Sequence, residues 1–342
     1  MRKRLFSILQ YIIFLGGGIF LVWWQLKSMT AEQKTAFIAA FRHANYWLLF
    51  PVILGIFFSH FSRAMRWKLM MEPLGYRPAI KNVFAVTMVG YFANAAVPRL
   101  GEILKCTFLA RYENLKVDKL VGTIIIERTF DFFCYLVFIC ITVLIQIDIV
   151  GEYVKEKLKL ITLSPGFPLW GKLLIMVVIL LIMLWFTKFL FKKFPENKII
   201  LKVNSILSGV IEGFKSIITL KRRRAFLLHT IFIWTMYLMQ IYIGFYAMEG
   251  TAHLSIKAGC SVLSLATLAM IITPGGIGSF PIFVMETLLI YKISPTLGIA
   301  FGWLMWGIFT GIIIIAGLLA LVLLPYMNKN IIKDEISTTD PI

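Results

Sequence analysis

The sequence has few charged residues for its length. Only 15% of the 342 residues are charged, whereas 59% are hydrophobic. Soluble globular proteins average about 25% charged residues, so this chain lacks the polar surface that a soluble fold of its size requires. The composition excludes a soluble globular protein and predicts an all-α polytopic membrane protein.

The motifs of metal sites and of nucleotide chemistry are also missing. The four cysteines lie in apolar segments without a CxxC pair, and the four histidines are scattered without an HExxH arrangement. No nucleophile and base stand together in a recognisable pattern, and no phosphate-binding loop of a nucleotide enzyme is present. We therefore expect no cofactor and no metal, and a protein that is not an enzyme.

Acidic residues are scarce relative to basic ones. The chain has 35 Lys and Arg against 17 Asp and Glu, a formal net charge of +18. A strongly basic chain can indicate a nucleic-acid partner, but in so apolar a protein the enrichment of Lys and Arg in cytoplasmic loops explains the same balance. We expect no nucleic-acid partner.

Long apolar runs are abundant. A helical span needs about 20 mostly apolar residues, and six runs meet this requirement: 6–25, 47–66, 121–147, 169–190, 226–249 and 297–324. The first run follows Arg2-Lys3-Arg4 but lacks the small residues of a cleavage site, which favours an uncleaved span over a signal peptide. The sequence therefore predicts about six transmembrane helices.

Two further apolar runs are interrupted near their centres. The run 83–110 contains Asn94, Pro98 and Glu102, and the run 257–291 contains Thr273-Pro274-Gly275-Gly276-Ile277-Gly278. Proline removes a backbone donor and clustered glycines disfavour a helix. Because irregular backbone survives at membrane depth only where protein or water covers it, we predict two re-entrant broken-helix hairpins whose tips line an interior site.

The order of elements predicts an inverted repeat within a single membrane domain, 1–327. Each half contains two spans, a broken hairpin and a third span, at about 5–147 and 169–325, and three spans per half give the halves opposite orientations. The alternative is that the chosen boundaries create the symmetry. An amphipathic linker at about 191–225 lies on the cytoplasmic side, and 328–342 is a disordered cytoplasmic tail. Most Lys and Arg then fall on one side, which predicts a multi-pass protein of a bacterial-type cytoplasmic (inner) membrane with both termini cytoplasmic.

Five charged residues remain at membrane depth. Arg99 and Glu102 lie at the first tip, and Glu127, Arg128 and Asp131 lie in the following span at spacings that share one helix face. We predict a network in which Arg99 meets the carboxylates. The network either binds a ligand or only holds the hairpin in place. Arg63 and Arg66, at the cytoplasmic end of the second span, are interpreted as snorkelling side chains.

The two tips together predict a phosphate site. Pro98 and Pro274 each precede a short helix, whose N-terminus presents free N–H groups and a partial positive charge. The glycines of the second tip allow N–H groups to converge on an anion, although they also permit close helix approach. The candidate substrate-binding residues are Asn94, Pro98, Arg99, Gly101, Glu102, Glu127, Arg128, Asp131, Pro274, Gly275, Gly276 and Gly278.

At these residues the chain resembles the lysylphosphatidylglycerol synthase transmembrane region family, a flippase-like domain. Four motifs carry the resemblance over about residues 5–325: Arg63-x-x-Arg66-Trp67, Asn94-x-x-x-Pro98-x-x-Gly101-Glu102, Gly122-x-x-x-x-Glu127-Arg128-x-x-Asp131 and Pro274-Gly275-Gly276-Ile277-Gly278. In bifunctional members this domain is implicated in moving an aminoacylated lipid, and a soluble aminoacyl-transferase domain follows it. We expect a stand-alone member without lipid aminoacylation. The family often has an acidic residue where this chain has Pro281, and Glu286 is no evident substitute.

Three functions of different kinds are compatible with the sequence. The resemblance and the tips together favour a lipid translocase that moves a membrane phospholipid or a polyprenyl-phosphate-type lipid. A secondary transporter of a small soluble anion would use the same tips, and a non-transporting membrane protein of envelope assembly would need no cavity there. Oligomers are compatible with each alternative.

Overall fold

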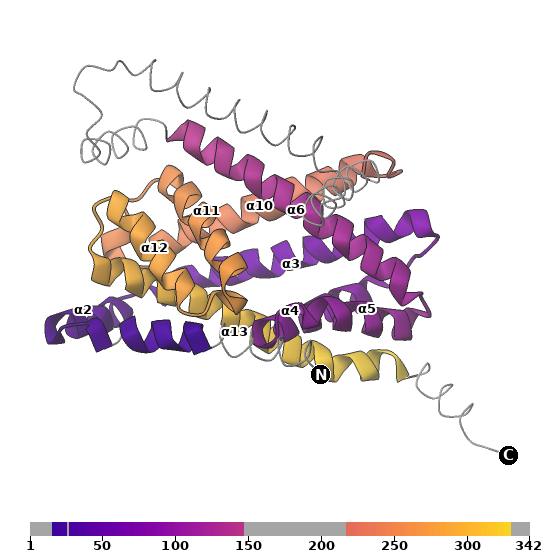
Figure 1. Cartoon of the computed structure of the whole chain (residues 1–342), viewed down its shortest axis with the longest axis horizontal. Coiled ribbons are helices and arrows are strands. Elements are labelled where there is room, and N and C mark those ends of the chain that lie inside the picture. Colours follow the sequence, from indigo (N-terminus) through magenta and orange to yellow (C-terminus); the bar gives the residue numbers. More distant parts are fainter. Residues whose placement is uncertain (1–15, 26, 147–216, 330–342) are drawn as a thin grey trace, which may run out of the picture.

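The computed structural model describes residues 16–25, 27–146 and 217–329, which contain helices and no strand (Figure 1). Four of these helices are long and apolar enough to cross a membrane: α3 (Leu49–Met71), α6 (Val117–Ile145), α10 (Arg223–Phe245) and α13 (Pro295–Met327). Their outer faces carry exposed apolar side chains such as Phe50, Ile231 and Val322. The all-α polytopic membrane protein predicted from the composition is confirmed.

Some predicted elements lie wholly or partly outside the described residues. These are the span 169–190, most of the linker 191–225, the first part of the span 6–25 and the tail from residue 330. Asn328, which we assigned to the tail, is instead a buried residue that ends α13. A helix not anticipated from the sequence, α2 (Ala31–Arg42), begins at Thr30, whose side chain and that of Gln33 form a capping box.

Both interrupted runs form helical hairpins. The first consists of α4 (Ile80–Ala96) and α5 (Leu100–Glu113), and the second of α11 (Ile256–Ile272) and α12 (Ser279–Ile290), with the short 3₁₀ turn η4 (Pro274–Gly276) between them. At 1.5 Å per residue even the longer arms reach only about 25 Å, less than the roughly 30 Å of a hydrocarbon core. Each hairpin therefore enters the molecule and turns back.

The two hairpins enter from opposite ends of the molecule. In Figure 1, α4 and α5 extend from the right and α11 and α12 from the left, with α3 and α10 side by side between them. The tips meet in the middle, where Gly275 lies against the backbone of Ala95. This geometry agrees with the predicted opposite orientation of the halves.

The last span of each half packs on the hairpins of both halves, because α13 contacts α12 as well as α4, and α6 contacts α5 as well as α11. Gly317 of α13 lies against Met88 and Phe92 of α4. The Tyr135 hydroxyl of α6 donates to the Ser264 carbonyl of α11, at 2.9 Å. These contacts between the halves place the first tip, and the helices that carry its charges, at the centre of the structure.

Candidate functional site

The first tip is shaped by one proline, one asparagine and one glycine. Pro98 interrupts the run, so α4 ends at Ala96 and α5 begins at Leu100 after Arg99, whose φ is 67°. The Asn94 side-chain oxygen accepts from the Gly101 N–H at 2.8 Å. A Cβ at Gly101 would overlap the Gly90 carbonyl oxygen, so only glycine allows α4 and α5 to approach this closely.

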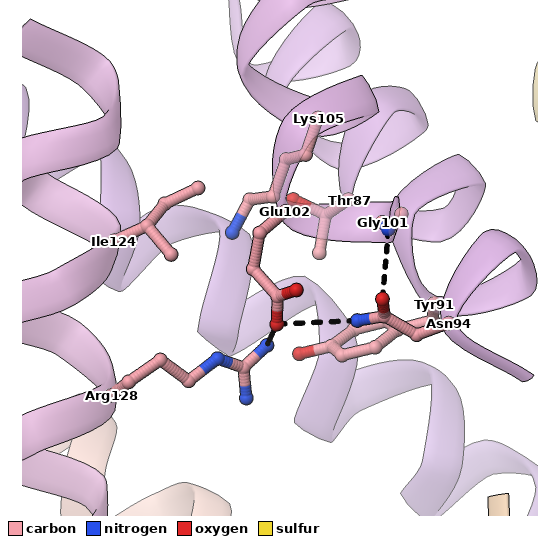
Figure 2. A pocket seen from close by; sticks show the side chains of 9 residues that line it. Thr87, Tyr91, Asn94, Gly101, Glu102, Lys105, Ile124 and Arg128 are labelled. Atoms are coloured by element: carbon pink, nitrogen blue, oxygen red, sulfur yellow. Dashed lines mark hydrogen bonds and ion pairs between the residues drawn. The ribbon is translucent and has the colours of Figure 1, made fainter. Parts of the chain in front are cut away.

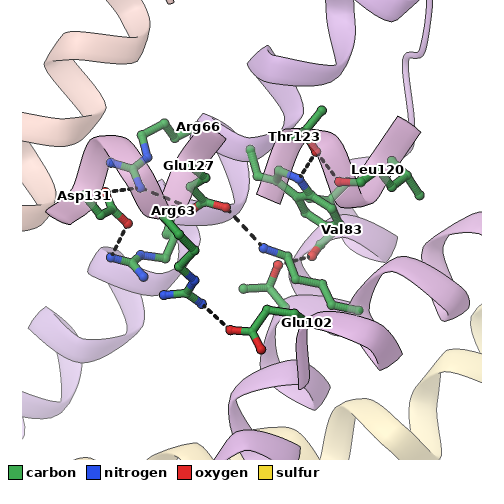
Figure 3. Close-up of polar contacts among 12 residues, drawn as sticks. Arg63, Arg66, Val83, Glu102, Leu120, Thr123, Glu127 and Asp131 are labelled. Carbon is green, nitrogen blue, oxygen red and sulfur yellow. Dashed lines mark hydrogen bonds and ion pairs between the residues drawn. The ribbon is translucent and has the colours of Figure 1, made fainter. Parts of the chain in front are cut away.

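Behind the tip, two arginines of α3 pair with two carboxylates of α6 (Figure 3). Arg66 Nη2 lies 2.6 Å from Asp131 Oδ1 and 3.2 Å from Glu127 Oε1, and Arg63 Nη2 lies 3.2 Å from Asp131 Oδ2. The Arg66 side chain is 0% exposed and that of Glu127 is 2% exposed. Buried charges of this kind require partners, and each of these arginines has one.

Neutral groups from other elements complete the network. Arg63 donates to the Tyr91 hydroxyl of α4 at 3.0 Å, and Arg66 donates to Thr230 of α10 at 3.2 Å. Lys105 of α5 lies 3.5 Å from Glu127 Oε2 and 3.8 Å from the centre of the Trp67 ring. The network therefore joins α3, α6 and α10 to both arms of the first hairpin.

A small pocket opens beside this network (Figure 2). Glu102 Oε1 lies 3.5 Å from Arg128 Nη2 and accepts a hydrogen bond from the Asn94 amide at 3.3 Å, whereas no described residue hydrogen-bonds the buried Glu102 Oε2. Arg128 is the accessible cation here, with a side chain that is 42% exposed. The pocket is lined by Thr87, Gly90, Tyr91, Asn94, Gly101, Glu102, Lys105, Ile124 and Arg128.

The network and the pocket together have a surplus of positive charge. Arg63, Arg66, Lys105 and Arg128 stand against Glu102, Glu127 and Asp131. Apolar spans surround this set, so the unbalanced charge favours an anionic ligand. Among the described residues, no group of three His, Cys, Asp or Glu side chains is placed to hold a metal ion.

The glycine-rich tip makes contacts that differ from those expected. Gly275, Gly276 and Gly278 all have positive φ, but the Gly276 and Ile277 N–H groups donate to carbonyls of their own turn, at 3.0 and 3.4 Å. These two amides therefore do not converge on an anion as predicted. Trp306 donates to the Gly275 carbonyl at 2.7 Å and Gln25 donates to the Gly278 carbonyl at 2.8 Å, which fix the tip in place.

Two interpretations from the sequence are wrong. Arg99 is exposed at the tip, next to exposed Pro98, and it makes no ion pair with a described residue. The carboxylates instead meet Arg63 and Arg66, which we took for snorkelling side chains and which are buried. Because a snorkelling assignment considers only the distance to the end of a span, it missed that both arginines face the carboxylates of α6.

The remaining candidates lie in the pocket, in the buried network or at the second tip. Asn94, Gly101, Glu102 and Arg128 line the pocket, and Glu127 and Asp131 belong to the buried network. Pro274, at the start of η4, and the three glycines shape the second tip. Lys105 is not among the predicted candidates, because it lies in the apolar run 83–110 outside the motif at the tip. Glu286 is exposed on α12, and buried Pro281 lies against Gly302 of α13.

Comparisons with known proteins identify the family of this chain. The family described as Lysylphosphatidylglycerol synthase TM region matches residues 7–317, which include both tips and every charged residue of the network. A UPF0104 membrane protein of Methanocaldococcus jannaschii is 22% identical over 254 residues, covering 69% of this chain and 72% of that protein. No solved structure matches significantly. The chain belongs to the lysylphosphatidylglycerol synthase transmembrane region family of multi-pass membrane proteins.

Proposed function

We propose that this protein is a lipid translocase that moves a phosphate-bearing headgroup across the cytoplasmic membrane, without catalysing a reaction. One observation carries the proposal. Arg128 lies on the same face of α6 as Ile125 and Phe132, one turn away on either side, and both apolar side chains are exposed. A cation flanked by lipid-facing apolar groups suits a ligand that has an anionic head and apolar tails.

The pocket next to Arg128 has a cavity of about 10 Å³, room for one water molecule, so it would have to widen to receive the headgroup. A guanidinium binds a phosphate through two parallel hydrogen bonds, and the half-exposed Arg128 has Glu102 as its only ionic partner among the described residues. The phosphate would replace Glu102 at Arg128, while Asn94 continues to hold Glu102. The exposed Arg99 adds a second cation at the tip.

The lipid tails would remain outside the protein. A charge at the centre of a bilayer is costly, so a headgroup crosses only where protein groups replace its water. The meeting hairpin tips provide such groups halfway between the ends of the molecule. Family membership supports a lipid as the substrate, and the shared chemistry of phospholipids and polyprenyl phosphates is the phosphate.

The direct test is translocation in reconstituted liposomes. We would measure the flip rate of fluorescent phosphatidylglycerol, phosphatidylethanolamine and a fluorescent polyprenyl phosphate with the wild-type protein and with Arg128→Gln, Glu102→Gln and Arg99→Gln. Loss of one charged contact worth about 1.4 kcal/mol corresponds to a tenfold lower rate, so we expect at least this loss for Arg128→Gln. Arg42→Gln, at an exposed arginine of α2, is the matched control and should flip lipid at the wild-type rate.

The same liposomes separate the competing functions. Uptake of labelled inorganic phosphate without any lipid flipping would indicate the soluble-anion transporter. Wild-type liposomes that behave like protein-free ones in both assays would favour the non-transporting membrane protein. Equal flip rates in wild type, Arg128→Gln and Glu102→Gln would overturn the proposed headgroup site.

A further inference from the structure

The third spans of the two halves both end in a buried side-chain amide. Gln146 is the C-cap residue of α6, and Asn328 is the C-cap residue of α13. Both residues are buried, although each stands at the end of an apolar helix where water is near. A buried amide is costly unless its hydrogen bonds are satisfied, so the partners of each one show what it does.

Gln146 joins α6 to both arms of the second hairpin. Its amide nitrogen donates to the Lys257 carbonyl, in the first turn of α11, at 2.7 Å. Its oxygen accepts from the Ser261 hydroxyl at 2.7 Å and from the hydroxyl of Tyr291, the residue that ends α12. One side chain thereby closes the open end of the hairpin onto α6.

Asn328 does the same for the first hairpin. Its amide nitrogen and oxygen each bond the Asn82 side-chain amide, in the first turn of α4, and both distances are 2.9 Å. Asn82 in turn donates to Glu113 Oε1 at 2.6 Å, and Glu113 is the last residue of α5. The first hairpin is therefore closed onto α13 through a chain of three side chains.

The two clusters correspond to one another under the inverted repeat. Each ties the C-terminal end of one half's last span to the open end of the other half's hairpin. They lie at opposite ends of the molecule, because α6 and α13 run in opposite directions (Figure 1). The side chains differ, Gln, Ser and Tyr against two Asn and a Glu, whereas the positions and the partners match.

We infer that Gln146 and Asn328 are paired gate residues, each of which holds one end of the protein closed by fastening a hairpin to the opposite half's last span. The inference rests on the proposed translocation, because a carrier must open to each face in turn. Water that enters one end can satisfy the freed amide groups there. Either gate can therefore open without leaving buried groups unpaired, while the other gate stays closed.

Two native cysteines report on the gates separately. Cys260 lies in α11, next to Ser261 of the Gln146 gate, and Cys106 lies in α5, two turns before Glu113 of the Asn328 gate. Both thiols are buried. Each should react with a water-soluble maleimide only when its own hairpin separates from the opposite span.

The experiment is thiol labelling of the detergent-purified full chain, with the extent of reaction at each cysteine read by peptide mass spectrometry. Gln146→Ala should raise the labelling rate of Cys260 about tenfold and leave Cys106 unchanged, and Asn328→Ala should do the reverse. The control is Gln240→Ala, which removes a buried amide of α10 outside both gates and should change neither rate.

The outcomes decide the inference without a lipid assay. Selective exposure, with thermal unfolding close to that of wild type, supports it. Unchanged labelling in both gate variants, or equal exposure of both cysteines in either variant, overturns it. Selective labelling in a protein that flips no lipid would reject the proposed function but still support the two gates. Lipid flipping with unselective labelling would reject the gates but not the proposed function.

Discussion

At the scale of single residues, burial divides the arginines of the site into two kinds. Arg66 is fully buried between Asp131, Glu127 and Thr230, whereas the Arg128 side chain is 42% exposed next to Glu102. Removing one partner of a buried ion pair leaves an uncompensated charge in a medium that solvates it poorly. An exposed pair contributes about 0–1 kcal/mol. Substitution of Arg66 should therefore lower the stability of the protein far more than substitution of Arg128.

We predict that Arg66→Leu lowers the free energy of unfolding by about 3 kcal/mol or more, because Glu127 and Asp131 each lose a buried partner. Arg128→Leu should lower it by less than about 1 kcal/mol while it abolishes most lipid flipping. Both values are measured by denaturant titration in mixed micelles. Equal losses of stability in the two variants would contradict the division of roles.

The charged residues of the network were only partly predictable. The four-residue spacing of Glu127 and Asp131 places them on one helix face, and the structure brings them together as expected. Which cations they meet depends on packing between helices that are distant in sequence. Arg63 and Arg66 reach them because α3 packs beside α6. Arg99, near them in sequence, lies on the outer side of the tip.

At the scale of elements, the first hairpin depends on the close approach of its two arms. The Gly101 N–H binds the Asn94 side chain, and the space where a Cβ would stand is occupied by the Gly90 carbonyl and by Asn94. Backbone cannot yield as a flexible side chain can, so an added methyl group must push α4 and α5 apart. The pocket lies between these arms and would change shape with them.

We expect Gly101→Ala to lower the free energy of unfolding by about 3 kcal/mol and to reduce lipid flipping. Gly122→Ala is the matched control, because this glycine lies within α6 and a Cβ there meets nothing within 4 Å. The control should change stability by about 1 kcal/mol or less, and if anything raise it, since alanine favours a helix. Thermal unfolding of the two variants measures the difference, and similar melting temperatures would refute the steric argument.

The broken helices were predictable and their contacts were not. Proline at positions 98 and 274, with glycine at 275, 276 and 278, marks both breaks within a few residues, because these types disfavour a continuous helix wherever they occur. The amide directions at the second tip depend on φ values and on Trp306 and Gln25, which come from distant parts of the chain. Local sequence therefore located the tips without determining the groups that they present.

At the scale of the whole molecule, each last span joins the hairpins of the two halves. α13 packs on α12 of its own half and on α4 of the other, and α6 packs on α5 and on α11 in the same way. The order of elements predicted an inverted repeat, but the similarity between the halves is too slight to reveal which helices pair. The matching gates at Gln146 and Asn328 join residues more than a hundred positions apart, so no local sequence pattern predicts them.

The arrangement of the helices also defines two ends that should face opposite sides of the membrane. Lys116 at the start of α6 and Arg77 before α4 lie at one end, and Glu249 after α10 lies at the other, because α6 and α10 both run between these ends. More of the described basic residues lie at the Lys116 end than at the Glu249 end, where Lys257 and Lys292 are found. Lys68, Lys81, Lys119 and Lys221-Arg222-Arg223-Arg224 lie at the Lys116 end, which the positive-inside rule assigns to the cytoplasm.

We therefore predict that a thiol at Lys116→Cys reacts with a membrane-impermeant maleimide only after cells are permeabilised, whereas one at Glu249→Cys reacts in intact cells. Both positions are exposed in the structure, so lack of labelling reports the side of the membrane rather than burial. Labelling is measured above that of the parent chain, which carries the four native cysteines. Reaction at position 116 in intact cells would reverse the orientation, and with it the face from which each hairpin enters the membrane.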